Sequence, residues 1–233
     1  MTRPLRKAVL ALGGLTLGGI VLAGCGTSTS PVAVPTRPPS GSPAAAPTAA
    51  PTGAPAAART SITINGNEAL RWGNGPYGVV LAHGSSYAAA SWERQAPQIA
   101  AQGATVIAVE DISPAAIEDA VDYLKSHGAP KVALMGGSAG ADAILQVASR
   151  QPDLADQLVL LSPNQEVTGL GSEPKLIIAS ADEPRVGVAK QLVASSPGDR
   201  NTVRIIAGRA HAQAILKHDD GTVLDLILAR LRG

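Results

Sequence analysis

Short apolar runs alternate with helix-like segments along residues 61–233, and this alternation restricts the fold more than any other feature. Apolar runs of this length are typical of parallel strands that are buried on both faces. The expected strands of this kind cover 78–82, 105–109, 131–135, 157–161, 175–179 and 202–206. Two alternating segments at the start, Ser61–Asn65 and Ala69–Trp72, predict an antiparallel hairpin. The sequence therefore predicts an α/β fold with a doubly wound, mostly parallel sheet.

Helices are expected between these strands. Ser91 is expected to cap a helix that runs to about Ala101. Ser113 is a second cap, with Pro114 at the first helical position, and its helix is expected to end near Ser126. Three further helical segments are expected at 141–148, 186–193 and 222–231.

The strand at 131–135 runs directly into Gly136-Gly-Ser-Ala-Gly140, and a helical segment follows. Strand, G-x-S-x-G and helix in this order form the nucleophile-elbow pattern, in which the serine stands on a sharp turn. Glycines on both sides let the strand and the helix pack closely. The start of the helix presents free N–H groups to negative charge that develops at the serine. Ser138 is therefore the candidate nucleophile, and it needs a base to accept its proton.

Polar residues also follow other expected strands. They lie at the carboxyl ends of the strands, where functional sites in such sheets are found. His83-Gly84, the elbow, Asp182-Glu183 and Gly208-Arg-Ala-His211 occur in that order along the chain. Together they resemble the α/β-hydrolase superfamily, specifically a small serine esterase or dienelactone-hydrolase-like member. The resemblance covers residues 61–233. It implies hydrolysis of an ester-type bond in a small molecule through an acyl-enzyme, with no large cap domain.

The resemblance also implies the roles of individual residues. His211 becomes the general base, which later returns its proton to the leaving group. In this family the turn that carries the acid often has the sequence Asp-Pro-x-Val, with the catalytic acid just before the proline. In this chain that register favours Glu183, while Asp182 stays open as the alternative acid.

Two backbone N–H groups are expected to form an oxyanion hole, which stabilises the developing negative charge. One belongs to Ala139, the residue after the nucleophile. The other is assigned to Ser85, with Ser86 as an alternative, in the loop after the strand at 78–82. The loop at 162–174 is expected to border the acyl pocket.

The remaining histidines are not expected to take part in proton transfer. His83 should be structural, while His127 and His218 should be solvated. No cluster of His, Cys and carboxylate residues at metal-ligand spacing occurs in the sequence, so we expect no metal and no organic cofactor.

The N-terminal residues 1–24 have the pattern of a signal peptide. Arg3, Arg6 and Lys7 precede an apolar stretch at 8–21 that is short for a membrane span. Leu22-Ala-Gly-Cys25 then resembles the lipobox of a bacterial lipoprotein, which implies cleavage before the cysteine and lipid attachment to it. We expect the protein on the extracytoplasmic face of a bacterial membrane. An ordinary signal peptide or a single anchor helix remains the alternative.

Residues 25–60 are rich in Pro, Ala, Thr and Ser and lack hydrophobic periodicity, so they are predicted to form a disordered tether. The formal net charge is +1 and the basic residues are scattered, which argues against binding to nucleic acid. Two alternatives remain open for the function. One is a non-catalytic binding lipoprotein on a hydrolase fold, and the other is a peptidase or thioesterase. The sequence does not fix the oligomeric state.

Overall fold

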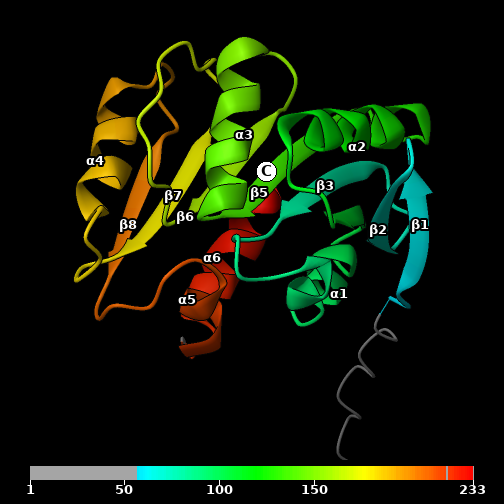
Figure 1. Cartoon of the computed structure of the whole chain (residues 1–233), viewed down its shortest axis with the longest axis horizontal. Helices are drawn as coiled ribbons and strands as arrows, with labels where there is room; N and C mark the ends of the chain where they lie inside the picture. The colour runs from blue at the N-terminus through cyan, green and yellow to red at the C-terminus, as the bar shows by residue number, and fades with distance from the viewer. Residues whose placement is uncertain (1–56, 219, 233) are drawn as a thin grey trace, which may run out of the picture. The chain divides into compact units, whose positions relative to one another are not determined.

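The computed structural model describes residues 57–218 and 220–232. In this part of the chain, eight strands form one sheet in the order β1-β2-β4-β3-β5-β6-β7-β8 (Figure 1). The strands are β1 (Thr60–Ile64), β2 (Asn67–Trp72), β3 (Tyr77–Ala82), β4 (Ala104–Val109), β5 (Lys131–Gly137), β6 (Gln157–Leu161), β7 (Lys175–Ser180) and β8 (Thr202–Ile206). Strand β2 pairs antiparallel with β1 and β4, and the other neighbouring strands pair in parallel. The predicted doubly wound, mostly parallel sheet is confirmed.

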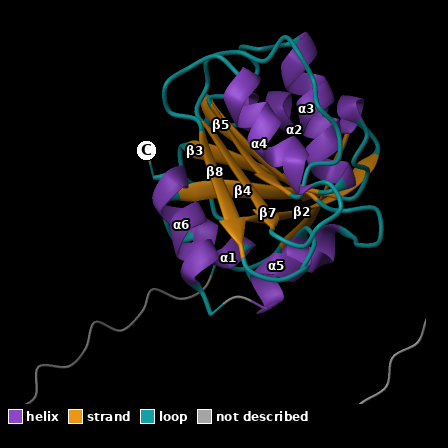
Figure 2. Ribbon diagram, turned by 90° about the vertical axis from the view of Figure 1, so that its left-hand side faces the viewer, coloured by secondary structure: helices purple, strands orange, loops and turns teal. Residues whose placement is uncertain are grey.

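Helices cover both faces of the sheet, so the molecule has three layers (Figure 2). Helices α2, α3 and α4 pack on one face, whereas η1, α1, α5 and α6 pack on the other. Their bounds are η1 (Ala89–Trp92, a 3-10 helix), α1 (Ala96–Ala100), α2 (Pro114–Ser126), α3 (Ala139–Arg150), α4 (Val186–Ser195), α5 (Gln213–His218) and α6 (Thr222–Leu231).

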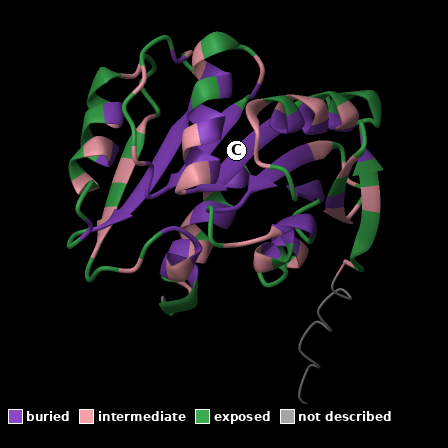
Figure 3. Ribbon diagram, in the orientation of Figure 1, coloured by how far each residue is buried: buried purple, intermediate pink, exposed green. Residues whose placement is uncertain are grey.

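The central strands are buried because both of their faces carry helices. Every residue of β4, β6 and β7 is buried, which explains why these strands are mostly apolar and show no alternation of apolar and polar residues. The edge strands β1 and β8 are much more exposed (Figure 3). In the described ranges, no segment between strands forms a cap domain, and the loop at 162–174 connects β6 directly to β7.

Two helical predictions need correction. The continuous helix expected from Ser91 to about Ala101 is wrong, because η1 ends at Trp92 and α1 begins only at Ala96. Pro97 explains the break, since proline lacks an N–H and clashes with the carbonyl four residues earlier. The side chain of Ser91 donates to Ala88 O at 2.7 Å instead of capping a helix. Helix α5 was not expected.

The predicted signal peptide at 1–24, the predicted lipidation site Cys25 and the tether up to residue 56 lie outside the described residues. Within residues 57–218 and 220–232, no helix combines the length and the apolar character needed to cross a membrane.

Candidate active site

Ser138 stands at the sharp turn between β5 and α3. Its φ of +51° and ψ of −115° are unusual for a residue with a side chain. A Cβ on Gly136 would lie 2.7 Å from the carbonyl carbon of Gly140, and a Cβ on Gly140 would collide with the carbonyl oxygens of Ala82 and His83. Both glycines are therefore needed for α3 to start so close to the strands, and this packing holds the serine at the strand end.

A line of hydrogen bonds joins three of the predicted site residues. His211 Nε2 lies 2.9 Å from Ser138 Oγ, and His211 Nδ1 lies 2.9 Å from Glu183 Oε2. With the proton on Nδ1, the imidazole donates to the carboxylate and accepts from the serine hydroxyl. The residues come from the loops after β5, β7 and β8, whose carboxyl ends meet at one edge of the sheet. The imidazole is 45% exposed, so the site is open to solvent.

Glu183 is a buried carboxylate whose two oxygens are both bonded. Oε1 accepts the Ser162 hydroxyl at 2.7 Å and the Ser180 N–H at 2.8 Å, while Oε2 faces the imidazole. Asp182 is exposed. Its backbone N–H donates a hydrogen bond to Gly208 O, and its side chain forms no hydrogen bond with another described residue. The structure thus brings Glu183, and not Asp182, to His211.

The turn after β3 lies against the serine. Tyr87 N–H donates to Gly84 O at 2.9 Å, which places Ser85 and Ser86 at the centre of a tight turn. Ser85 is exposed. Ala139 is the first residue of α3, so its N–H has no intrahelical acceptor. Neither N–H of the predicted Ser85 and Ala139 pair donates a hydrogen bond to another described residue.

Gln213 is a site residue that the sequence reasoning missed. It is only 2% exposed, and its Oε1 accepts the Gly84 N–H at 3.3 Å. Its Nε2 donates to Ser91 Oγ at 3.1 Å. Because Gln213 lies two residues after His211, its amide connects the loop of the base to the turn that carries Ser85.

Asn164 was also missed, although its loop was expected to border the site. Its Nδ2 donates to Ser138 Oγ at 3.2 Å and to Asp142 Oδ2 at 3.0 Å. The Asn164 backbone N–H donates to the other oxygen of Asp142 at 2.8 Å. A carboxylate accepts only, so Asp142 fixes the amide with its nitrogen toward the serine.

The other three histidines lie away from this hydrogen-bond line. His83 is buried, and its ring nitrogens face Gly84 O at 2.8 Å and Glu110 O at 3.0 Å, as expected for a structural residue. His127 and His218 are exposed. Among the described residues, no group of three or more His, Cys, Asp or Glu side chains is placed to hold a metal.

The sequence matches no protein-family model and no curated protein. Solved structures do resemble this chain. An esterase/lipase from an uncultured bacterium has 16% identity and a TM-score of 0.62 over 78% of this chain and 86% of its own. A monoacylglycerol lipase from Paleococcus ferrophilus has 13% identity and a TM-score of 0.59, with coverages of 70% and 97%. Epoxide hydrolase A from Mycobacterium thermoresistibile has 15% identity and a TM-score of 0.58, with coverages of 76% and 98%. The described domain therefore has the α/β-hydrolase fold.

Proposed function

We propose that this protein is a serine hydrolase that cleaves an ester-type acyl bond in a small molecule. The observation that carries the proposal is the hydrogen-bond line from Ser138 through His211 to Glu183. This arrangement fits a nucleophile, a general base and an acid that orients the base.

In the first half-reaction, His211 Nε2 takes the hydroxyl proton as Ser138 Oγ attacks the carbonyl carbon of the ester. The negative charge on the carbonyl oxygen is stabilised by the N–H groups of Ser85 and Ala139. Glu183 stabilises the imidazolium. The ester C–O bond then breaks, the leaving alcohol takes the proton from Nε2, and the acyl group stays on Oγ.

In the second half-reaction, His211 takes a proton from water, whose oxygen attacks the acyl carbon. The tetrahedral intermediate collapses, and Nε2 returns its proton to Ser138 Oγ. A carboxylic acid leaves, and the enzyme regains its starting state. No step needs an oxidant, a reductant or a second substrate other than water.

Structural likeness supports the fold and leaves the choice of reaction to the site. The similar structures include an esterase/lipase, a monoacylglycerol lipase and an epoxide hydrolase. A fold of this kind hosts several reactions. Serine paired with a base suits acyl transfer, and this favours an ester substrate. Because the imidazole of His211 is 45% exposed, an ester can reach it directly from solvent.

A fluorophosphonate probe tests this proposal, because it labels an activated serine covalently. Labelling of the full chain should be abolished in Ser138→Ala and retained in Ser149→Ala, which changes a half-buried serine whose hydroxyl bonds only to Gln146 O. Absence of labelling on the folded wild-type protein would instead support a non-catalytic binding protein. Matched ester, thioester and amide substrates then separate the esterase from a thioesterase or a peptidase.

We also propose that Cys25 carries lipid and anchors the protein to the extracytoplasmic face of a bacterial membrane. The support is the sequence pattern Leu22-Ala-Gly-Cys25 after a basic and an apolar segment. Two or more acyl chains give stable membrane attachment. Cys25→Ala should move the protein from the membrane fraction to the soluble fraction while probe labelling persists. Unchanged membrane association would contradict lipidation.

A further inference from the structure

A cavity of about 460 Å³ lies at the ends of the strands opposite to Ser138. Tyr77, Lys131 and Gln157 line it, and they are the first residues of β3, β5 and β6. Ser138 follows the carboxyl end of β5, so this cavity lies at the amino ends of the parallel strands. Its volume falls within the range of roughly 300–1,000 Å³ that is usual for small-molecule sites.

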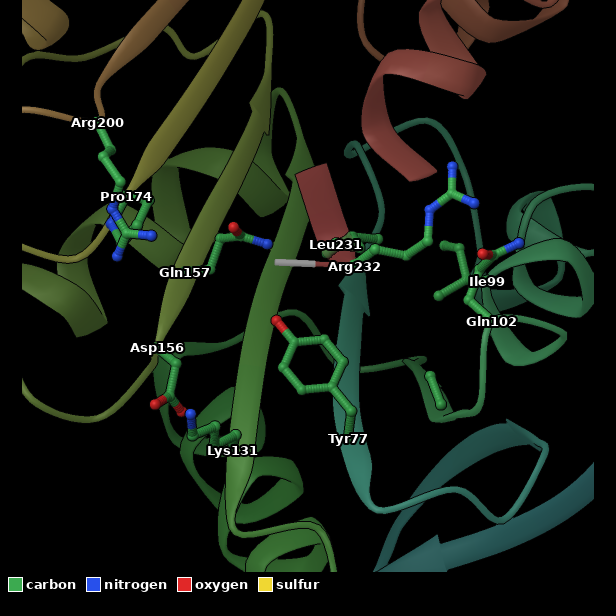
Figure 4. Close-up of a pocket in the computed structure, with 11 residues that line it drawn as sticks. Tyr77, Ile99, Gln102, Lys131, Asp156, Gln157, Pro174, Arg200, Leu231 and Arg232 are labelled. Atoms are coloured by element: carbon green, nitrogen blue, oxygen red, sulfur yellow. The ribbon is translucent and has the colours of Figure 1, made fainter. Parts of the chain in front are cut away.

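Two polar groups in the wall of this cavity have no partner. Gln157 is only 6% exposed, and its side-chain amide forms no hydrogen bond to any residue in 57–218 or 220–232. The hydroxyl of Tyr77 likewise has no hydrogen-bond partner among these residues. In Figure 4, Gln157 and Tyr77 lie between the guanidinium groups of Arg200 and Arg232. The polar atoms of both side chains reach the open space of the cavity, so a ligand there can form hydrogen bonds with them.

The cavity also carries an excess of positive charge. Lys131, Arg200 and Arg232 line it together with a single carboxylate, Asp156. In the described part of the chain, none of the three cations forms an ion pair. Arg230 adds a further cation beside them, because its Nη1 donates to the carbonyl oxygen of Arg200 at 3.1 Å. Burial and then the charge of Arg200 lower the pKa of Arg230, so these two cations repel each other, and a bound anion would relieve that repulsion.

The remaining groups define the rest of the ligand. Burial and the charge of Asp156 raise the pKa of Tyr77 to about 12, so its hydroxyl stays a neutral donor at ordinary pH. Ile99 and Leu231 are buried apolar residues in the same wall. The cavity is also far larger than an inorganic anion, so its occupant needs an organic body.

We infer that this cavity binds a small organic anion, namely a molecule that carries a carboxylate or phosphate group on an apolar body. The guanidinium of Arg200 or that of Arg232, which lie on opposite sides of Gln157 in Figure 4, would hold the anionic group, since a guanidinium fork matches both carboxylate and phosphate oxygens. The amide of Gln157 and the hydroxyl of Tyr77 would bond the same end of the ligand, and the apolar body would lie against Ile99 and Leu231.

Titration calorimetry on the full chain tests the inference with three probes that share one ring system. These are 2-naphthoate, 2-naphthyl phosphate and the neutral 2-naphthalenemethanol. At least one anion should bind about tenfold or more tightly than the alcohol. Which anion binds more tightly identifies the preferred group. Absence of binding by both anions up to about 5 mM, or equal binding of the alcohol, overturns the inference.

Variants separate this cavity from the candidate active site. Arg200→Gln/Arg232→Gln should weaken binding of the preferred anion about tenfold or more. Arg94→Gln/Lys190→Gln removes the same charge at exposed positions outside the cavity and should leave binding unchanged. An equal loss in both double variants contradicts the site.

Gln157→Leu provides a second, independent variant, because it keeps every charge and nearly the same volume. It should weaken binding of the anion about fivefold or more. Circular dichroism confirms that each variant is folded. Unchanged affinity in folded Gln157→Leu contradicts the role of the buried amide.

Discussion

Ser162 Oγ donates a 2.7 Å hydrogen bond to Oε1 of Glu183, and both residues are buried. The Ser162 Oγ also accepts a hydrogen bond from the N–H of Ala212 at 3.0 Å. Ala212 directly follows His211, and both Ser162 and Ala212 have a positive φ. One hydroxyl on the loop after β6 therefore connects the loop of the acid to the loop of the base.

Ser162→Ala is expected to lower kcat/KM about tenfold, because it removes a bond to the buried carboxylate and leaves the Ala212 N–H without its acceptor. Initial rates on a p-nitrophenyl ester measure the effect. Ser149→Ala serves as the control, since this serine is half-buried and its hydroxyl bonds only to Gln146 O. Equal rates in Ser162→Ala and wild type would show that the connection does not position the base.

Glu183→Gln is expected to lower kcat by about 10³–10⁴-fold, the loss known for the corresponding amide change in serine proteases. The amide no longer selects the required imidazole tautomer or stabilises its cation. Asp182→Asn should change kcat by less than about twofold, because Asp182 is exposed and does not reach His211. The reverse ranking in steady-state kinetics would assign the acid to Asp182.

Gln213→Leu is expected to lower kcat about tenfold with little change in KM. The leucine keeps the buried volume but cannot accept the Gly84 N–H, so the turn that carries Ser85 loses its fixed position. Negative charge on the substrate oxygen develops only in the transition state. Weaker stabilisation of this charge therefore lowers kcat. Gln213→Glu restores an acceptor and should recover part of the rate. A rise in KM alone would indicate a role in substrate binding instead.

The pKa of Tyr77 predicts how stability responds to alkaline pH. Burial, reinforced by Asp156, raises this pKa to about 12 in the folded protein, against about 10 in the unfolded chain. Below pH of about 10 the phenol is protonated in both states. Between about 10 and about 12 the unfolded chain gives up the proton more easily, so the free energy of unfolding falls as pH rises.

Urea unfolding at a series of alkaline pH values measures this slope, and Tyr77→Phe should make it shallower. Absorbance at about 295 nm should show a tyrosine transition near pH 12 in the wild type that is absent from the same variant. Retention of that late transition in Tyr77→Phe would contradict its assignment to Tyr77.

The parts of the fold that the sequence predicted are those with strong local signals. Buried parallel strands such as β4 and β6 appear as apolar runs, and Ser113-Pro114 marks the start of α2. Pro97 is itself a local signal for the break between η1 and α1. The prediction gave more weight to the capping pattern at Ser91. Helix α5 was missed because it is only six residues long, too short for a clear hydrophobic period.

The supporting residues of the site carry no such local signal. Gln213 contacts Gly84 across 129 positions of the chain, and Asn164 contacts Ser138 across 26. Such pairs meet only after the sheet has assembled, and glutamine and asparagine occur in many loops without a special role. A turn motif locates Ser138, whereas the side chains around it follow from tertiary packing.

Strand β8 is an edge strand that pairs only with β7, and the loop after it carries His211. Its residues are exposed or only partly buried, whereas every residue of β5 after Lys131 is buried and this strand leads to Ser138. Edges with few buried contacts open at lower free energy than the interior of a sheet. We therefore expect heat to inactivate the protein through local unfolding of β8, before the interior of the sheet unfolds. The opening of this one strand then determines how long the site around His211 stays intact.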